Sequence, residues 1–150
     1  MKKEKDLSRF IEAQNGKYAG YAAALAEFKE DGYKSGHWIW YIFPQLAHEF
    51  PGQSETNIFY SLQGVGEARA YMADATLGPR LVEISTALLG LESNDPEDVM
   101  NSWVDAKKLC SCMTLFSAVA PEQPVFNAVL EKFFGGKKCE WTQAALSEVK

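Results

Sequence analysis

Apolar residues recur every three or four positions through most of the chain, and residues that end helices separate the runs. Leu77, Leu81, Ile84 and Leu88 form the clearest run, which Gly90 ends, and their spacing places them on one face of an α-helix. Similar runs cover residues 7–14, 18–28, 109–120, 126–133 and 142–148, whereas the apolar–polar alternation of strands is nearly absent. The pattern predicts an all-α fold, a compact and mostly orthogonal bundle of roughly six to eight helices.

Helix start and stop signals agree with these runs. Asp6 is expected to cap the first helix, and Asp74 or Thr76 the helix that begins at Leu77. Asp95 precedes a proline and two acidic residues, which is typical of a first helical turn. Glycines at positions 16, 32, 90, 135 and 136 follow the predicted helices as stop signals.

The length of 150 residues, without repeats or linkers, predicts one globular domain over residues 1–150, with residues 1–5 flexible. The N-terminus MKKEKDLSRF lacks the apolar stretch of a signal peptide, and the longest apolar run, Trp38–Phe43, has six residues. About 20 would be needed to span a bilayer, so no membrane partner is predicted. Three cysteines do not indicate a disulfide framework, and we expect a cytoplasmic protein.

The charge balance limits the classes of partner. With 15 basic and 20 acidic residues the net charge is -5, so the chain has no positive excess with which to bind a nucleic-acid polymer. A small anionic ligand held by one or two positioned cations is compatible with this composition. The sequence indicates no particular oligomeric state.

Aromatic residues gather in one part of the chain. Seven lie between residues 38 and 60: Trp38, Trp40, Tyr41, Phe43, Phe50, Phe59 and Tyr60. The apolar segment 36–44 is too short for periodicity to separate a buried helix from a buried strand. Ser35 as a cap and Pro44 as a stop favour a helix, while the aromatic and β-branched content favours a strand. We predict a helix and keep the strand as the alternative.

The segment 37–45, HWIWYIFPQ, resembles the signature of the bacterial domain-of-unknown-function family 1810. Matching motifs follow in order: DLSRFIEAQ at 6–14, EARAY at 67–71, LGPRL at 77–81, DAKKLCSCMTLF at 105–116 and FFGG at 133–136. The resemblance covers nearly the whole chain and implies a predominantly α-helical fold, but no established activity. The label calpastatin, common for such sequences, does not fit, because calpastatin's inhibitory segments are disordered. The chain departs from the family pattern at Gly36 and at residues 136–139.

The first candidate site residues are His37, Trp38 and Trp40. His37 would serve as a general acid or base, and either tryptophan would stack on a base or sugar. The alternative is an aromatic ridge of the core, with His37 bonded to a backbone carbonyl. Because residues 38 and 40 point about 200° apart on a helix, at least one of the tryptophans is expected to line a second surface.

Glu67 and Arg80 each flank an apolar stripe. They would form a structural salt bridge with each other, or Arg80 would bind an anionic group of a ligand while Glu67 orients it or acts as a general base.

Asp105, Lys108 and Ser111 accompany the apolar stripe of residues 109–120. Asp105 is either an N-cap or, if desolvated, an acid or base. Lys108 is either a surface residue or a cation for an anionic ligand. Gln45, an amide in an apolar setting, would bond buried backbone or the polar edge of a ligand.

No metal or cofactor is predicted. Cys110 and Cys112 would point about 200° apart on a helix, and His37 and His48 lack the spacing of metal ligands. The chain has no P-loop, dinucleotide-binding motif or nucleophile elbow.

These observations predict a protein with a small-molecule pocket. The finer hypothesis is a hydrolase that cleaves a glycosidic bond in a nucleotide- or ADP-ribose-like ligand. Its catalytic residues would be Glu67, Asp105 and His37, and its ligand-binding residues Trp38, Trp40, Gln45, Arg80, Lys108 and Ser111. The alternative is a non-catalytic protein-interaction or regulatory module, with exposed aromatic residues as its binding surface.

Overall fold

A computed structural model describes residues 6–47 and 54–148, and in these ranges it contains ten α-helices and one π-helical turn. In chain order the elements are α1 (Ser8–Gln14), α2 (Tyr21–Ala26), the π-helix η1 (Glu27–Asp31), α3 (Ile39–Ile42), α4 (Glu55–Tyr60), α5 (Val65–Ala73), α6 (Leu77–Leu89), α7 (Pro96–Met100), α8 (Trp103–Val119), α9 (Val125–Phe134) and α10 (Glu140–Glu148). The predicted all-α class is confirmed. The helices outnumber the prediction because α4, with no buried residue, and α5, with only Ala68 and Tyr71 buried, show no long apolar stripe. His48, Phe50 and residues 1–5, which entered the sequence analysis, lie outside the described residues.

Most of the predicted helix ends are present. The Asp95 carboxylate accepts from the backbone N–H of Glu97 at 2.9 Å, and Asp74 accepts from Leu77 at 2.9 Å. Asp6 accepts from the N–H of Ser8, the first residue of α1, at 3.0 Å. After η1 and α9, Gly32 and Gly135 take φ angles of 81° and 62°, a left-handed conformation that glycine adopts without strain.

The aromatic segment 36–44 is helical only at its centre, where α3 makes a single turn. Trp38, with φ of -139°, precedes the helix, so the cap predicted at Ser35 is wrong. The reason is Glu27, whose carboxylate accepts from the backbone N–H groups of Ser35 and Gly36 at 2.7 and 2.9 Å. With these N–H groups bonded to a side chain of η1, the chain enters α3 later than the sequence suggests.

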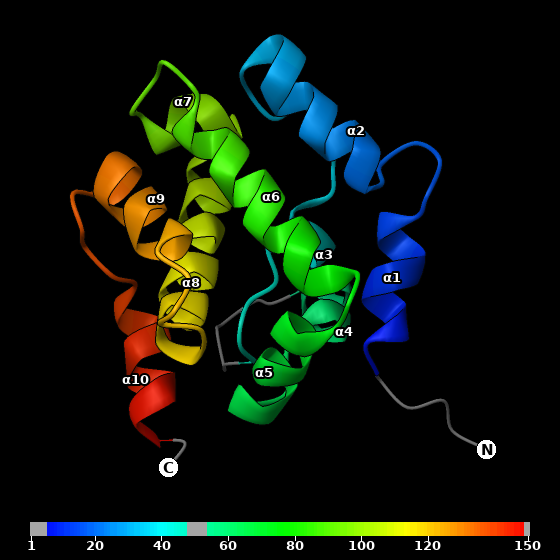
Figure 1. Ribbon diagram of the computed structural model, residues 1–150, viewed down its shortest axis with the longest axis vertical. Coiled ribbons are helices and arrows are strands. Elements are labelled where there is room, and N and C mark those ends of the chain that lie inside the picture. The colour runs from blue at the N-terminus through cyan, green and yellow to red at the C-terminus, as the bar shows by residue number, and fades with distance from the viewer. Residues whose placement is uncertain (1–5, 48–53, 149–150) are drawn as a thin grey trace.

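The core is built around α8. This helix packs against α5, α7, α9 and α10, and α6 packs against α5 and α9, while α1 and α2 lie on the far side of α6 from α9 and α10 (Figure 1). A line of aromatic rings crosses the core from Phe10 to Tyr71, Phe116 and Phe126, with centroids 5.2, 5.5 and 5.8 Å apart. Helices from both ends of the chain therefore share one apolar interior.

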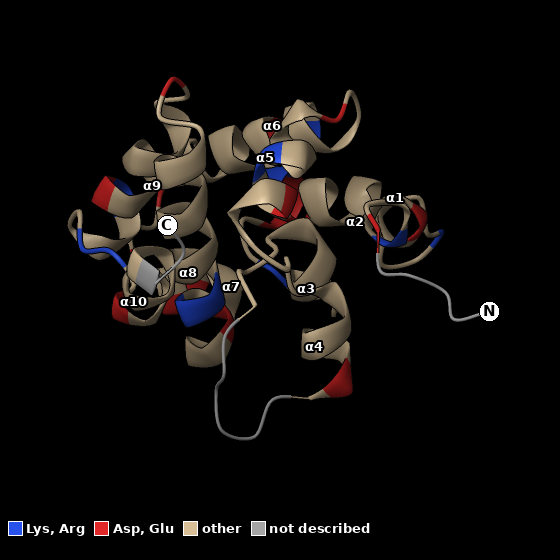
Figure 2. Cartoon of the chain, turned by 90° about the horizontal axis from the view of Figure 1, so that it is seen from below, with Lys and Arg blue, Asp and Glu red and all other residues tan. Residues whose placement is uncertain are grey.

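The distribution of charge and the apolarity of the helices bear on the partners that the protein can bind. Lys and Arg residues are spread over several helices rather than gathered on one face (Figure 2). No helix in the described ranges combines the length and the apolarity needed to cross a membrane.

Candidate functional site

A buried ion pair joins the segment before α3 to the first turn of α8. Lys34, only 5% exposed, donates from Nζ to the Asp105 carboxylate at 2.7 Å and to the Gly36 carbonyl at 2.6 Å. Its ammonium also lies 5.0 Å from the centroid of the Trp38 ring. Ser102 caps α8, so Asp105 is not the N-cap but stands inside the first turn, where a carboxylate also interacts favourably with the helix dipole.

Lys108 lies one turn further along α8, over the ring of Trp40. Its Nζ is 5.4 Å from the ring centroid, within the range of a cation–π contact. Burial lowers the pKa of Lys108, the nearby Asp105 raises it, and Lys34 lowers it further. The ion pairs of the described residues join Arg9 to Glu67 and Lys34 to Asp105, so none of them engages the Lys108 ammonium.

The indole N–H of Trp40 is buried and has no hydrogen-bond partner. An unsatisfied buried donor costs about 1–3 kcal/mol, so native structures rarely keep one without reason. Lys108 cannot relieve it, because an ammonium group has no lone pair with which to accept a hydrogen bond. An unpaired buried donor therefore lies beside a half-buried ammonium group. We call Lys34, Trp40, Asp105 and Lys108 the Trp40–Lys108 site.

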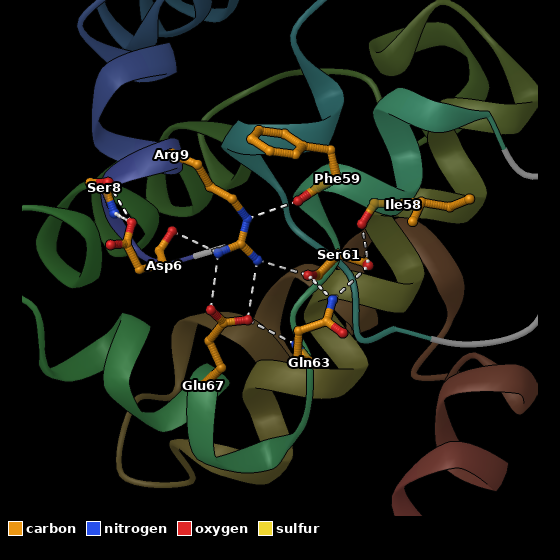
Figure 3. Close-up of polar contacts among 8 residues, drawn as sticks. All are labelled: Asp6, Ser8, Arg9, Ile58, Phe59, Ser61, Gln63 and Glu67. Atoms are coloured by element: carbon orange, nitrogen blue, oxygen red, sulfur yellow. Dashed lines mark hydrogen bonds and ion pairs between the residues drawn. The ribbon is translucent and has the colours of Figure 1, made fainter. Parts of the chain in front are cut away.

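Glu67 is bound to Arg9 of α1, as Figure 3 shows, whereas Arg80 bonds to Gln14 and Asn15. Arg9 Nη1 and Nη2 reach the two carboxylate oxygens at 3.0 and 3.1 Å. The backbone N–H of Gln63 donates to the same carboxylate at 2.8 Å. The predicted salt bridge between Glu67 and Arg80 is therefore wrong, because Glu67 pairs with Arg9 instead.

Arg9 uses every donor that it has. Its remaining N–H groups donate to the carbonyls of Asp6, Phe59 and Ser61 at 2.6, 2.8 and 2.8 Å. Since a guanidinium has five N–H donors, all of them are paired in this arrangement. The Arg9–Glu67 pair thus joins α1, the end of α4 and the start of α5.

Arg80 lies in a separate group of contacts between α1, α2 and α6. It donates to Gln14 Oε1 at 3.2 Å and to Asn15 Oδ1 at 3.1 Å, and its guanidinium lies 5.2 Å from the centroid of the Tyr21 ring. The Tyr21 hydroxyl donates to Glu83, and burial is the main reason why the pKa of Tyr21 is raised. The contacts of Arg80 itself are with two amide oxygens and a ring, not with a carboxylate.

The other predicted residues occupy different surroundings. Trp38 is fully buried and donates from Nε1 to Glu27 at 3.0 Å, so it belongs to the core and borders the site only through Lys34. Ser111 is buried and shares a 2.6 Å hydrogen bond with Thr142. His37 is exposed. The backbone carbonyl of Gln45 accepts a hydrogen bond from the backbone N–H of Leu62.

The structure therefore brings together three predicted residues: Trp40, Asp105 and Lys108. It adds Lys34, which sequence reasoning missed because a lone lysine in an irregular segment carries no periodic signal. Arg9 was also missed as Glu67's partner, although it stands within the motif at residues 6–14.

The thiols and carboxylates offer no metal centre in the described ranges. Groups of three or more His, Cys, Asp or Glu side chains that could hold a metal ion are absent there. Cys110, Cys112 and Cys139 are free thiols, and burial raises the pKa of Cys110 to about 11.

Two comparisons with known proteins identify the chain's relatives. The family model described as "Protein of unknown function (DUF1810)" matches residues 4–146. The crystal structure of the conserved hypothetical protein Rv1873 from Mycobacterium tuberculosis is similar to this chain, with a TM-score of 0.85 and 35% sequence identity over 95% of this chain and 97% of that one. No curated protein matches the chain. The chain therefore belongs to the DUF1810 family.

Proposed function

We propose that this protein binds a small anionic molecule at the Trp40–Lys108 site. One observation carries the proposal: the buried indole N–H of Trp40 lacks an acceptor beside the Lys108 ammonium, which has Asp105 nearby but is in none of the ion pairs of the described residues. An oxygen of a bound anion would accept from both groups and remove the cost of the unpaired indole donor. The lowered pKa of Lys108 has burial as its main cause, which fits a cation held ready in a partly dehydrated place.

The ligand class that fits best carries phosphate oxygens and a sugar, as nucleotides and ADP-ribose do. Phosphate oxygens are strong acceptors for an ammonium and an indole N–H. Asp105 would accept from a ribose hydroxyl, since Lys34 contacts its Oδ2 and a carboxylate has room for several donors.

In its more specific version, the proposal is that the protein also hydrolyses a glycosidic bond in the bound ligand. Its candidate base is Asp105, the carboxylate of the site. Glu67 is held by three N–H donors from Arg9 and Gln63, which leaves it poorly placed to take a proton from water. His37 is exposed and takes no part in the contacts that join Trp40 to Lys108 and Lys34 to Asp105, so binding is the function with the stronger support.

A second candidate function is a protein-interaction module at the neighbouring surface. Trp103 and Val104, in the first turn of α8, are 59% and 41% exposed, and Lys107 lies over the Trp103 ring at 4.9 Å. Large exposed aromatic residues are enriched at protein interfaces. A Trp103→Ala variant that loses a protein partner while keeping ligand binding would favour this function.

The test combines thermal shift with calorimetry. ADP-ribose, AMP and inorganic phosphate are compared with adenosine, which has the base and the sugar but no anionic oxygen. Trp40→Phe and Lys108→Met should each weaken binding about ten- to hundredfold, the value of one hydrogen bond to a charged group. The matched controls Trp103→Phe and Lys107→Met should bind as the wild type does. Equal affinity in all four variants, or no binding of any anion, would reject the proposal.

A further inference from the structure

A hollow of about 340 Å³ lies between α1 and the end of α4, away from the contacts of the Trp40–Lys108 site. Its wall includes Asp6, Ser8, Arg9, Glu12, Phe59 and Tyr60. None of these residues was among the candidate site residues of the sequence analysis. The hollow is formed where the Arg9–Glu67 pair draws α1 against the chain that leaves α4.

The cation in this wall is not available to a ligand. All five N–H donors of Arg9 are bonded to Glu67 and to three backbone carbonyls (Figure 3). Its charge is matched by Glu67, which lies on the side of Arg9 away from the Phe59 ring in that view. An anion entering the hollow would therefore find no free N–H on Arg9.

The rest of the wall consists mainly of acceptors and ring faces. The Ser8 hydroxyl already donates to the Asp6 carboxylate, so its free lone pairs can only accept. Glu12 is exposed and stands one turn after Ser8, on the same face of α1. Phe59, 43% exposed, packs edge-to-face on Tyr60 with centroids 4.8 Å apart.

The charges of Arg9 and Glu12 also affect the pKa of the Tyr60 hydroxyl. Burial raises the pKa of Tyr60, the neighbouring Arg9 lowers it and Glu12 raises it. The phenol therefore stays protonated at neutral pH, and a neutral aromatic residue lines the hollow.

We propose that this hollow binds an organic cation, an alkylammonium group carried by a small molecule. The Glu12 carboxylate would pair with the ammonium, and the Phe59 and Tyr60 rings would cover its alkyl part through cation–π and apolar contact. The chemistry is opposite to that of the Trp40–Lys108 site, where the indole donor of Trp40 lacks an acceptor. The two proposals are thus independent of each other.

The probe is n-butylammonium. Its binding is followed by two-dimensional ¹H–¹⁵N NMR of the whole chain. The expected result is saturable shifts of the backbone amides of Ser8–Glu12 and of Phe59 and Tyr60, with a millimolar Kd that rises as salt is added. The neutral isostere n-butanol should give much smaller shifts. Equal shifts with n-butanol, or no saturable shift at these amides, would overturn the proposal.

Substitutions in the wall of the hollow test which residues contact the ammonium ion. Glu12→Gln and Phe59→Leu should each raise the Kd about two- to fivefold, the value of one exposed charge pair or one cation–π contact. Glu55→Gln, which removes an exposed charge from α4 outside the wall, should leave the Kd unchanged. Because these residues are largely exposed, the amide spectrum of each variant should match the wild type elsewhere. An unchanged Kd for Glu12→Gln would contradict the proposed pairing.

Discussion

The Arg9 guanidinium of α1 and the Glu67 carboxylate of α5 form a two-pronged ion pair, Nη1–Oε2 at 3.0 Å and Nη2–Oε1 at 3.1 Å. The two residues are 58 positions apart in the chain. Their side chains are 4% and 17% exposed, so water competes little for these hydrogen bonds. The pair closes the N-terminal helix onto the core and builds one wall of the hollow beside α4.

Arg9→Lys should lower the free energy of unfolding by about 2–4 kcal/mol, although the charge is kept. A lysine has three donors and no planar fork, so at least two of the five acceptors around Arg9 would lose their bond. Urea denaturation measures the loss. Arg69→Lys, at an exposed position of α5, is the control and should change stability by less than about 0.5 kcal/mol. Equal stability of the two variants would show that the pair does not hold α1 in place.

The two tryptophans of the aromatic segment should respond differently to truncation. Trp38→Phe should cost about 2–4 kcal/mol, because it opens a cavity in a fully buried place and removes the bond to Glu27. Trp40→Phe should change stability by less than about 1 kcal/mol, because the packing that it loses is offset by removal of an unpaired buried donor. Denaturation of both variants without ligand checks this. A larger loss for Trp40→Phe would mean that its N–H has a partner.

Lys108→Met should change how the free energy of unfolding varies with pH in the alkaline range. The pKa of folded Lys108 lies below the unfolded value near 10.5, so between the two values the unfolded chain binds more protons at this residue, and its contribution to wild-type stability rises with pH. Methionine lacks this gain, and the advantage of Lys108→Met near neutral pH should shrink as pH approaches about 10. Tyrosines of the unfolded chain ionise near pH 10 as well, which lowers the stability of both proteins alike. Urea curves across this range, with Lys107→Met as the control, give the difference. A constant difference would contradict the lowered pKa.

Two glycines should respond to alanine with opposite signs. A Cβ at Gly78 in α6 would stand 2.2 Å from the Met72 carbonyl oxygen, so Gly78→Ala forces α5 and α6 apart and should cost about 1–3 kcal/mol. At Gly66 in α5 nothing lies within 4 Å of the added Cβ. Gly66→Ala should therefore stabilise the helix by about 0.5–1 kcal/mol. Thermal unfolding of both variants tests whether α5 and α6 approach as closely as described.

The helices were predictable where a long apolar stripe met a capping residue. The run from Leu77 to Leu88 became α6, and the Asp95–Pro96 start became α7. An apolar stripe gives no information about a helix boundary that is set by a contact with another segment of the chain. Glu27 bonds the backbone at Ser35 and Gly36, and this contact across η1 delays α3.

The candidate site was predictable only in its residue types. The two tryptophans differ as expected, since Trp38 is in the core and Trp40 lies under Lys108, but the helical angle is not the reason, because Trp38 precedes α3. The partners of the charged residues could not be deduced. Lys34 to Asp105 and Arg9 to Glu67 are contacts between distant segments, and periodicity carries information only about neighbours on one element.

The most direct test of the central claim observes the indole N–H of Trp40 itself. Its ¹H–¹⁵N signal, assigned by its loss in Trp40→Phe, is followed while ADP-ribose is added to the folded protein. If an anion oxygen accepts from this group, the proton signal should move downfield saturably and exchange more slowly with solvent, while the Trp38 signal stays fixed. ADP-ribose binding that leaves the Trp40 signal unchanged, or no response to ADP-ribose, AMP or inorganic phosphate, would contradict the account.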